Sequence, residues 1–307
     1  MKTAFLFSGQ GAQKLGMAKD LYDEFDIVRE TFDQASQVLG YDLRGLIDND
    51  EAKLNETQYT QPAILTTSVA ILRLLSEQGI KPDLVAGLSL GEYSALVASG
   101  ALDFVEAVAL VAKRGQYMTE AAPTGSGKMV AVMNTKAALI EEICEQASER
   151  GIVSPANYNT PAQIVIGGQA EAVDYAVELL KEAGVKRLIE LKVSGPFHTA
   201  ILKPASEKLA KELEQVNFNS FKLELISNTT VKVMKDTEIK ELLTRQVMEP
   251  VRFYESIETM KELGVQRFIE VGSGKVLSGF IKKIDKEASF TNVEDLASFK
   301  SILAEEA

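Results

Sequence analysis

The strongest constraint on the fold of this chain is a serine held between two glycines, in the pattern G-x-S-x-G at residues 87–91. A short apolar run at residues 84–87 leads into this turn, and an apolar stretch at about residues 92–98 follows it. These lengths predict a buried strand before Ser89 and a helix after it. Buried strands that run directly into helices are typical of parallel sheets, so we expect an α/β fold class.

The same alternation of short apolar runs and amphipathic helices recurs on both sides of this turn. We expect strands at residues 4–7, 84–87, 223–227 and 267–271, and helices at residues 62–75, 92–98, 103–118, 204–215, 238–247 and 254–263. Helices that alternate with short strands indicate a parallel sheet covered by helices.

The middle of the chain has a different order of elements. We expect strands at residues 129–133, 153–158, 163–166 and 187–193, and helices at residues 136–149 and 171–182. The order β-α-β-β-α-β is that of a small ferredoxin-like domain. Loop signals at residues 123–127 and 194–196 bound this stretch. We therefore expect a small domain, 127–193, inserted into a large α/β domain made of 1–126 and 194–307.

Composition argues against several classes of function. The formal net charge is −11, which disfavours nucleic-acid binding through a broad basic surface. No apolar run approaches the ~18 residues that a membrane helix needs, and residues 1–7 turn polar too soon for the core of a signal peptide. The single cysteine, Cys144, excludes an intrachain disulfide, so we expect a cytoplasmic protein. One cysteine and one histidine cannot build a Cys/His zinc site, so we expect no metal.

Ser89 is the first candidate for chemistry. A nucleophilic serine projects from a tight turn between a strand and a helix, and small neighbours relieve the crowding there. The helix that begins after Ser89 offers free backbone N–H groups where an oxyanion would form. The alternative is an ordinary strand-to-helix turn.

His198 is the only histidine, so any imidazole base must be this residue. It follows the loop at 194–196, where a cleft between two domains would open. The alternative is a surface histidine near a turn. No acidic residue stands in an obvious position to orient it, which departs from the order serine, acid, histidine of common hydrolases and leaves room for a neutral partner.

Arg114 lies near the end of the expected helix 103–118. A cation is electrostatically comfortable at the C-terminal end of a helix, and this alone accounts for it. The functional alternative is a bidentate clamp on a carboxylate.

Motifs along nearly the whole chain together resemble the malonyl-CoA:acyl-carrier-protein transacylases. They lie, in family order, at residues 8–13 (SGQGAQ), 87–92 (GLSLGE), 114–115 (RG), 156–163 (ANYNTPAQ), 195–198 (GPFH), 246 with 250–252 (Q and PVR) and 270–272 (EVG). The resemblance implies an α/β-hydrolase-like large domain with an inserted ferredoxin-like domain.

The resemblance also implies a role for each matching residue. Ser89 would be the nucleophile that becomes a malonyl ester, and His198 the base that deprotonates it and later the incoming thiol. Arg114 would bind the malonyl carboxylate, and Gln246 would orient His198 through its side-chain carbonyl. The remaining implied residues are the oxyanion-hole backbone N–H groups of Gln10 and Leu90 and the cleft-lining side chains of Asn157 and Phe197.

The implied reaction moves a malonyl group from malonyl-CoA to the phosphopantetheine thiol of an acyl carrier protein, which supplies fatty-acid elongation. The partners are then malonyl-CoA and the carrier protein, with no bound cofactor beyond the coenzyme A thioester used as substrate. Carrier proteins of this kind are acidic, so a chain with this net charge would dock through a local basic patch. Candidates for the patch, each of which could equally be a solvated surface cation, are Lys186, Arg187, Lys192, Lys275, Lys282 and Lys283.

Two positions depart from the family pattern. Leu88 stands where the serine turn commonly has a histidine, and Ser273 where the C-terminal Gly-Pro-Gly commonly has its proline. We expect activity to survive both. Two other functions stay open at this point. A serine hydrolase or thioesterase would use the same serine turn, and a non-catalytic module would only bind the carrier protein.

Overall fold

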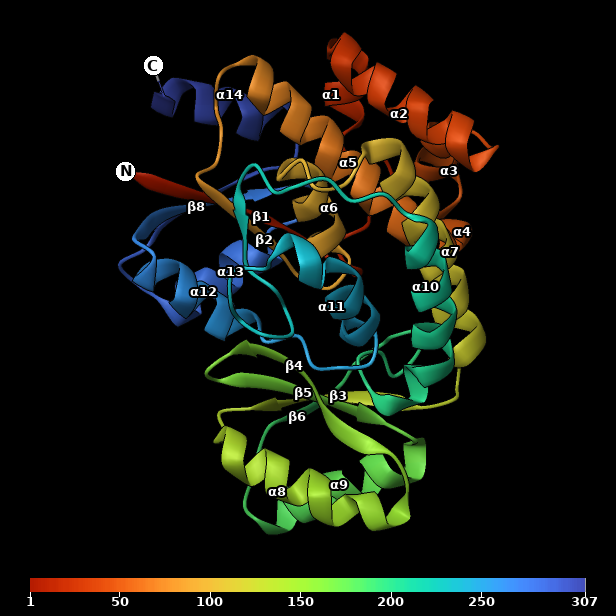
Figure 1. The fold of residues 1–307 in the computed structure, drawn as a ribbon. Coiled ribbons are helices and arrows are strands. Elements are labelled where there is room, and N and C mark those ends of the chain that lie inside the picture. The colour runs from red at the N-terminus through yellow and green to blue at the C-terminus, as the bar shows by residue number, and fades with distance from the viewer. Residues whose placement is uncertain (307) are drawn as a thin grey trace.

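The structure, a computed structural model that describes residues 1–306, has a larger and a smaller part, each built on its own sheet (Figure 1). The larger sheet has five parallel strands in the order β7-β2-β1-β8-β9. Their bounds are β1 Lys2–Phe7, β2 Leu84–Gly87, β7 Glu224–Leu225, β8 Val265–Val271 and β9 Ser289–Val293. The α/β fold class with a parallel sheet is therefore confirmed.

Helices cover both faces of this sheet, because its central strand is apolar on both sides. Phe5 and Phe7 of β1 join one core cluster, and Ala4 and Leu6 join another on the opposite face. The helices of the larger part are α1 Lys19–Glu24, α2 Asp26–Leu39, α3 Leu43–Asn49, α4 Glu51–Leu54, α5 Thr57–Glu77, α6 Gly91–Ala98, α7 Phe104–Ala121, α10 Lys203–Gln215, α11 Ile239–Gln246, α12 Phe253–Glu262, α13 Val276–Ile284 and α14 Leu296–Glu306.

The helix α5 begins earlier than its sequence pattern suggests. We expected it to start at Pro62, but it starts at Thr57 and includes the proline. The proline lies little more than one turn inside the helix, so its missing N–H leaves only the carbonyl of Gln58 without its helical partner. Nearly all of α5 is buried, which is typical of a helix that is surrounded by other elements.

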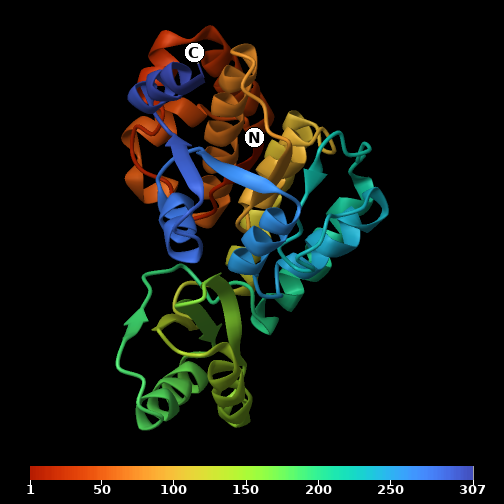
Figure 2. The same ribbon diagram turned by 90° about the vertical axis from the view of Figure 1, so that its left-hand side faces the viewer.

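The smaller part is a four-stranded antiparallel sheet with two helices on one face (Figure 2). Its elements are β3 Lys128–Met133, α8 Ala137–Ala147, β4 Val153–Thr160, β5 Gln163–Gly168, α9 Ala170–Glu182 and β6 Leu188–Glu190. Their sequence order and the spatial order β4-β5-β3-β6 fit the expected ferredoxin-like arrangement. We retain 127–193, inserted between 1–126 and 194–307, as the proposed domain division.

The last strand of the smaller sheet is shorter than expected. We predicted a strand at 187–193, but β6 ends at Glu190. Leu191, Lys192 and Val193 instead line a cleft between the two parts. Leu191 still donates its N–H to the carbonyl of Met129 on β3 at 2.9 Å, so the chain leaves the sheet gradually as it enters the cleft wall.

The two parts are also joined by backbone hydrogen bonds. The N–H of Tyr158 on β4 donates to the carbonyl of Val251, and the N–H of Val251 donates to that of Ala156, at 2.8 and 2.9 Å. The face of the smaller sheet that lies opposite α8 and α9 is thereby held toward the carboxyl ends of β1 and β2. Among residues 1–306, no helix combines the length and the apolar character needed to cross a membrane.

Candidate active site

Ser89 lies in a turn that only glycine neighbours allow. A Cβ atom on Gly87 would lie 1.9 Å from the backbone carbon of Gly91, and one on Gly91 would lie 2.0 Å from the carbonyl oxygen of Phe7. Ser89 itself has φ 55°, in the left-handed region that a non-glycine residue adopts at a cost. The strand β2 and the helix α6 hold it there, so its hydroxyl faces the cleft.

His198 meets Ser89 directly. The distance from Ser89 Oγ to His198 Nε2 is 2.7 Å, and His198 Nδ1 lies 2.8 Å from the backbone carbonyl oxygen of Gln246. A carbonyl oxygen only accepts, so Nδ1 carries the proton and Nε2 is free to accept from the serine. Burial, followed by the charge of Arg114, lowers the pKa of His198 to about 4. The imidazole is therefore neutral near pH 7, with the lone pair of Nε2 directed at the serine hydroxyl.

Gln246 holds His198 by a different atom from the one we expected. The side-chain carbonyl was predicted to orient the histidine, and this is wrong, because the backbone carbonyl at the end of α11 does so. The side-chain Oε1 instead accepts from Arg114 Nη2 at 2.9 Å. The side-chain Nε2 donates to the backbone carbonyl of Ser89 at 2.9 Å and to Glu92 Oε2 at 2.7 Å.

Arg114 is buried, with 1% of its surface exposed, and projects from α7 toward the serine. Its Nη1 donates to Gln61 Oε1 at 2.9 Å, and its Nη2 lies 3.3 Å from Ser89 Oγ. The Nε has no partner, and the guanidinium lies over the ring of Tyr93 at 5.3 Å. Its direct hydrogen-bond partners are all neutral oxygens, and the charged group that acts on it from a distance is the buried carboxylate of Glu92.

The backbone N–H groups of Gln10 and Leu90, which we predicted to form an oxyanion hole, both lie close to Ser89 in the fold. Gln10 lines the cleft beside Ser89, and Leu90 follows Ser89 at the start of α6. Within residues 1–306, neither N–H donates to a protein acceptor. The N–H of Ser89 itself is unavailable, because it donates to Asn228 Oδ1 at 2.7 Å.

Two buried polar residues beside the serine were not expected from the sequence. Asn228 donates from Nδ2 to the carbonyl of Gly87 at 2.6 Å as well as accepting from Ser89. Glu92, on α6, is fully buried, and burial raises its pKa to about 7. Signals for both existed, since Asn228 follows a strand of the parallel sheet and Glu92 is a charge within an apolar helix.

The cleft in front of Ser89 has a volume of about 420 Å³ and takes its walls from both parts of the molecule. Asn157 lines it from the smaller part, and Phe197 lines it beside His198. Leu88, at the position where we noted a departure, also lines it. The other lining residues are Gly11, Gln13, Asn55, Met129, Asn159, Val165, Leu191, Lys192, Val193, Ser194, Val276 and Phe280.

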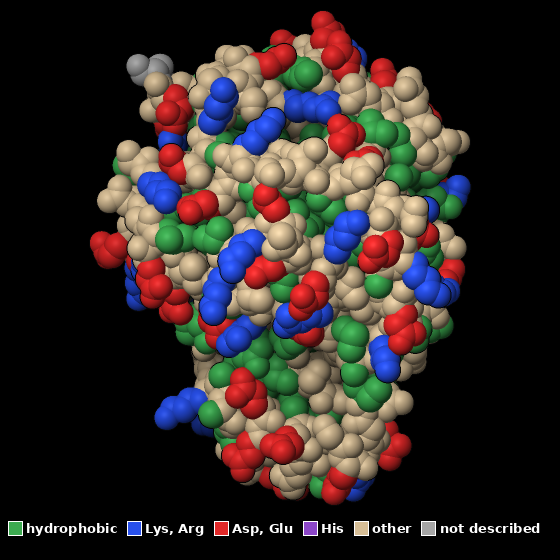
Figure 3. Space-filling model, viewed as in Figure 1, with side chains coloured by type: hydrophobic (Ala, Val, Ile, Leu, Met, Phe, Trp, Pro, Cys, Tyr) green, Lys and Arg blue, Asp and Glu red, His purple; other side chains and the backbone are tan. Residues whose placement is uncertain are grey.

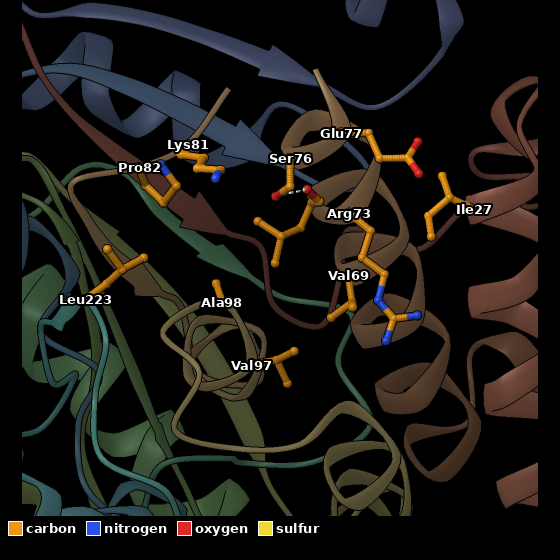
Figure 4. A pocket seen from close by; sticks show the side chains of 11 residues that line it. Ile27, Val69, Arg73, Ser76, Glu77, Lys81, Pro82, Val97, Ala98 and Leu223 are labelled. Carbon is orange, nitrogen blue, oxygen red and sulfur yellow. Dashed lines mark hydrogen bonds between the residues drawn. The ribbon is translucent and has the colours of Figure 1, made fainter. Parts of the chain in front are cut away.

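A larger depression, about 630 Å³, lies elsewhere, between α2, α5 and α6 (Figure 4). Its arginine, Arg73, is already bonded to the side chains of Thr31 and Gln34. The hydroxyl of Ser76 donates to the carbonyl of Leu72 in its own helix. Glu77 and Lys81 also line this depression, but its lining contains no histidine and its one serine is bonded within α5, so it lacks the serine–histidine pair of the cleft. In the described part of the chain, no cluster of three or more His, Cys, Asp or Glu residues could hold a metal ion.

Comparisons with known proteins show which family the chain resembles. Residues 4–299 match the family model described as acyl transferase domain. The chain is 47% identical to the malonyl CoA-acyl carrier protein transacylase of Bacillus subtilis over 96% of this chain and 94% of that protein. It is also 47% identical to the enzyme of that name from Escherichia coli K12, over 92% of each.

Solved structures extend the likeness to the whole fold. The crystal structure of MCAT from Streptococcus pneumoniae is 68% identical, covers 99% of this chain and 100% of that one, and superposes with a TM-score of 0.98. A malonyl-transacylase solved in complex with its type II PKS acyl-carrier protein is 44% identical over 99% of this chain and 100% of that one, with a TM-score of 0.96.

Proposed function

Because the chain belongs to the family of malonyl CoA-acyl carrier protein transacylases, we propose that Ser89 is the residue that carries the malonyl group between its two thiol carriers. The enzyme is an acyltransferase that moves malonyl from malonyl-CoA to the phosphopantetheine thiol of acyl carrier protein, for fatty-acid synthesis. One observation carries the assignment of the site. A base and a fixed cation both converge on Ser89 Oγ, at 2.7 Å from His198 Nε2 and 3.3 Å from Arg114 Nη2.

The first half of the reaction loads the serine. His198 Nε2 takes the proton of Ser89 Oγ as the oxygen attacks the thioester carbonyl. The negative oxygen that forms would be held by the N–H groups of Gln10 and Leu90. The intermediate collapses, the C–S bond breaks, and His198 gives its proton to the departing coenzyme A thiolate. In the second half, His198 deprotonates the carrier thiol, and the thiolate attacks the malonyl-serine ester. The ester C–O bond then breaks, and His198 returns the proton to Ser89 Oγ as the serine leaves.

The partner of His198 is the neutral backbone carbonyl of Gln246, and this suits a malonyl thioester as substrate. Thioesters are activated, so the reaction does not need the stronger base that an aspartate partner would create. A carboxylate there would also repel the malonyl carboxylate. Arg114 would bind that carboxylate, because its planar fork matches two oxygens and stays charged at working pH.

The cleft supports the other parts of the proposal. Asn157 and Phe197 would shape the space for the acyl group, and one methyl of difference there is worth only ~1–3 kcal/mol, so selectivity against larger acyl groups is modest. Lys192 lines the cleft, while Lys186 and Arg187 line a separate depression of the smaller part. We therefore favour Lys192 for contact with the acidic carrier protein.

The distribution of charged side chains on the surface also belongs to the proposal. Lys and Arg side chains lie among Asp and Glu on the face drawn in Figure 3, several of them where the two parts meet. Contact with the carrier would then be local rather than spread over the surface.

The reaction as written needs no bound cofactor or metal, and its substrates are those of a cytoplasmic enzyme.

Intact-protein mass spectrometry after brief exposure to malonyl-CoA tests the assignment. The wild type should gain one malonyl group and lose it when carrier protein is added. Ser89→Ala should gain none, whereas Ser126→Ala, in an exposed loop, should behave as the wild type. Free malonate without an adduct would favour a hydrolase instead. No adduct and no turnover would favour a module that only binds the carrier, and a stable adduct on Ser89→Ala would refute the nucleophile.

A further inference from the structure

A buried carboxylate that takes no part in the reaction described above lies beneath the catalytic serine. Glu92 is the second residue of α6 and has no exposed surface. Its carboxylate accepts one hydrogen bond on each oxygen. The backbone N–H of Asn228 donates to Oε1 at 2.7 Å, and the side chain of Gln246 donates from Nε2 to Oε2 at 2.7 Å.

These two donors belong to the two halves of the active site. Asn228 holds the turn, because its side chain bonds the N–H of Ser89 and the carbonyl of Gly87. Gln246 holds the base and the cation, because its backbone carbonyl faces His198 and its Oε1 faces Arg114. Glu92 is thus a direct link between the loop after β7 and the end of α11.

Glu92 also selects the orientation of the Gln246 amide. The two hydrogens of Nε2 are used by Glu92 and by the backbone carbonyl of Ser89, so Oε1 must point toward Arg114. A flipped amide would place its oxygen against two acceptors and its NH₂ against a guanidinium. We propose that Glu92 is a positioning residue of the transfer reaction, which fixes Gln246 so that Arg114 is held ready for the malonyl carboxylate. This inference rests on the proposed function of the site.

The role depends on the ionised form of Glu92. Only a carboxylate accepts on both oxygens without presenting a donor, whereas a protonated carboxyl carries an O–H and a glutamine amide an NH₂ that would face one of these two donors. Arg114 on α7 and Tyr93 on α6 are the ionisable groups that act on Glu92, while Asn228 and Gln246 present neutral groups to it. Burial raises its pKa to about 7, so the ionised form prevails above that pH and is lost below it.

The variant Glu92→Gln imitates the protonated state without changing the size of the side chain. Whichever way the introduced amide points, its NH₂ faces either the N–H of Asn228 or the NH₂ of Gln246. Glu270→Gln is the matched control, because Glu270 is a buried carboxylate that accepts two backbone N–H bonds, from Leu277 and Ser278, and has no hydrogen bond to the site.

The experiment measures kcat/KM for malonyl-CoA and for acetyl-CoA between pH 5.5 and pH 8 in the wild type and both variants. At pH 8, Glu92→Gln should lose about ten-fold with malonyl-CoA, the effect of one misplaced charge-assisted hydrogen bond, and far less with acetyl-CoA. In the wild type, the ratio of malonyl to acetyl activity should fall as the pH drops through 7 toward that of the variant. The control should keep the wild-type ratio at every pH.

Each outcome decides a separate point. Equal losses with both substrates would overturn the role of Glu92, and so would a wild-type ratio of malonyl to acetyl activity that does not change with pH. In either case, a wild-type protein that still transfers malonyl would leave the proposed function intact. If Glu92→Gln does not fold, as judged by circular dichroism, the wild-type ratio across pH 7 still decides. A wild type that forms no malonyl-serine would instead refute the proposed function itself.

Discussion

Arg114 shows how a cation can be buried beside the candidate nucleophile, with its Nη2 3.3 Å from Ser89 Oγ. Removing a guanidinium from water is costly unless other groups take the place of the water. Here the carbonyl oxygens of Gln61 and Gln246 do so, and the ring of Tyr93 lies against the cation. None of these groups carries a negative charge, which is why we propose that the Arg114 guanidinium could bind an acyl carboxylate held beside Ser89.

Arg114→Ala should therefore reduce the use of malonyl-CoA far more than that of acetyl-CoA. Acetyl lacks the distal carboxylate, and a buried charge pair that loses one partner costs about 3 kcal/mol, or about a hundred-fold in kcat/KM. Single-turnover acylation of Ser89 with each thioester measures the two losses. Arg73→Ala, in the remote depression, serves as the control. Equal losses for the two thioesters would refute the carboxylate role.

The limit of sequence reasoning is also visible at a single residue. The resemblance of Gln246 to a family position predicted that its side-chain carbonyl orients His198. In the structure Gln246 does contact His198, but through its backbone carbonyl oxygen. A residue name does not tell whether its backbone or its side chain is used, because that depends on where the helix α11 ends. Asn228 and Glu92 were missed since their partners are distant in sequence.

At the scale of elements, the unit β2–turn–α6 could be predicted because its cause is local. The apolar run, the two glycines and the helix are adjacent in the sequence, and the tight approach of Gly91 to Phe7 explains the second glycine. The edge strand β9 was not expected. Its residues are mostly polar or partly exposed, and only pairing with β8 makes them a strand.

Gly91→Ala should destabilise this unit and abolish acylation of Ser89. Its Cβ would lie 2.0 Å from the carbonyl oxygen of Phe7, so β1 and α6 would have to move apart. Overpacking of this kind costs about 1–3 kcal/mol or more. Thermal unfolding and malonyl loading measure the two effects.

Gly279→Ala provides the matched comparison for that substitution. Gly279 lies in α13 with open space around a Cβ atom. Alanine is favoured over glycine inside a helix by about 0.5–1 kcal/mol, so this variant should gain slightly in stability. A Gly91→Ala enzyme that loads malonyl as fast as Gly279→Ala would contradict the packing argument.

At the scale of the whole molecule, the pKa of the single histidine depends on the folding of the two parts around it. His198 follows the connection back from the smaller part, is 4% exposed, and lies in the cleft between the two sheets. Unfolding exposes it to water, which restores its pKa from about 4 to 6.5. Between these values the unfolded chain binds a proton that the native protein does not, so stability rises with pH across this window.

Lowering the pH from 7.5 to 5 should therefore destabilise the wild type by about 2 kcal/mol more than it destabilises His198→Ala, from the conversion of about 1.36 kcal/mol per pKa unit. Glu92 acts in the opposite sense, because its pKa is raised from 4.5 to about 7, but both proteins retain it and the comparison removes its effect. Urea unfolding followed by far-ultraviolet circular dichroism measures the difference, since the chain has no tryptophan. Equal pH dependence in the two proteins would show that His198 titrates normally in the native state, and would refute the lowered pKa that burial gives it here.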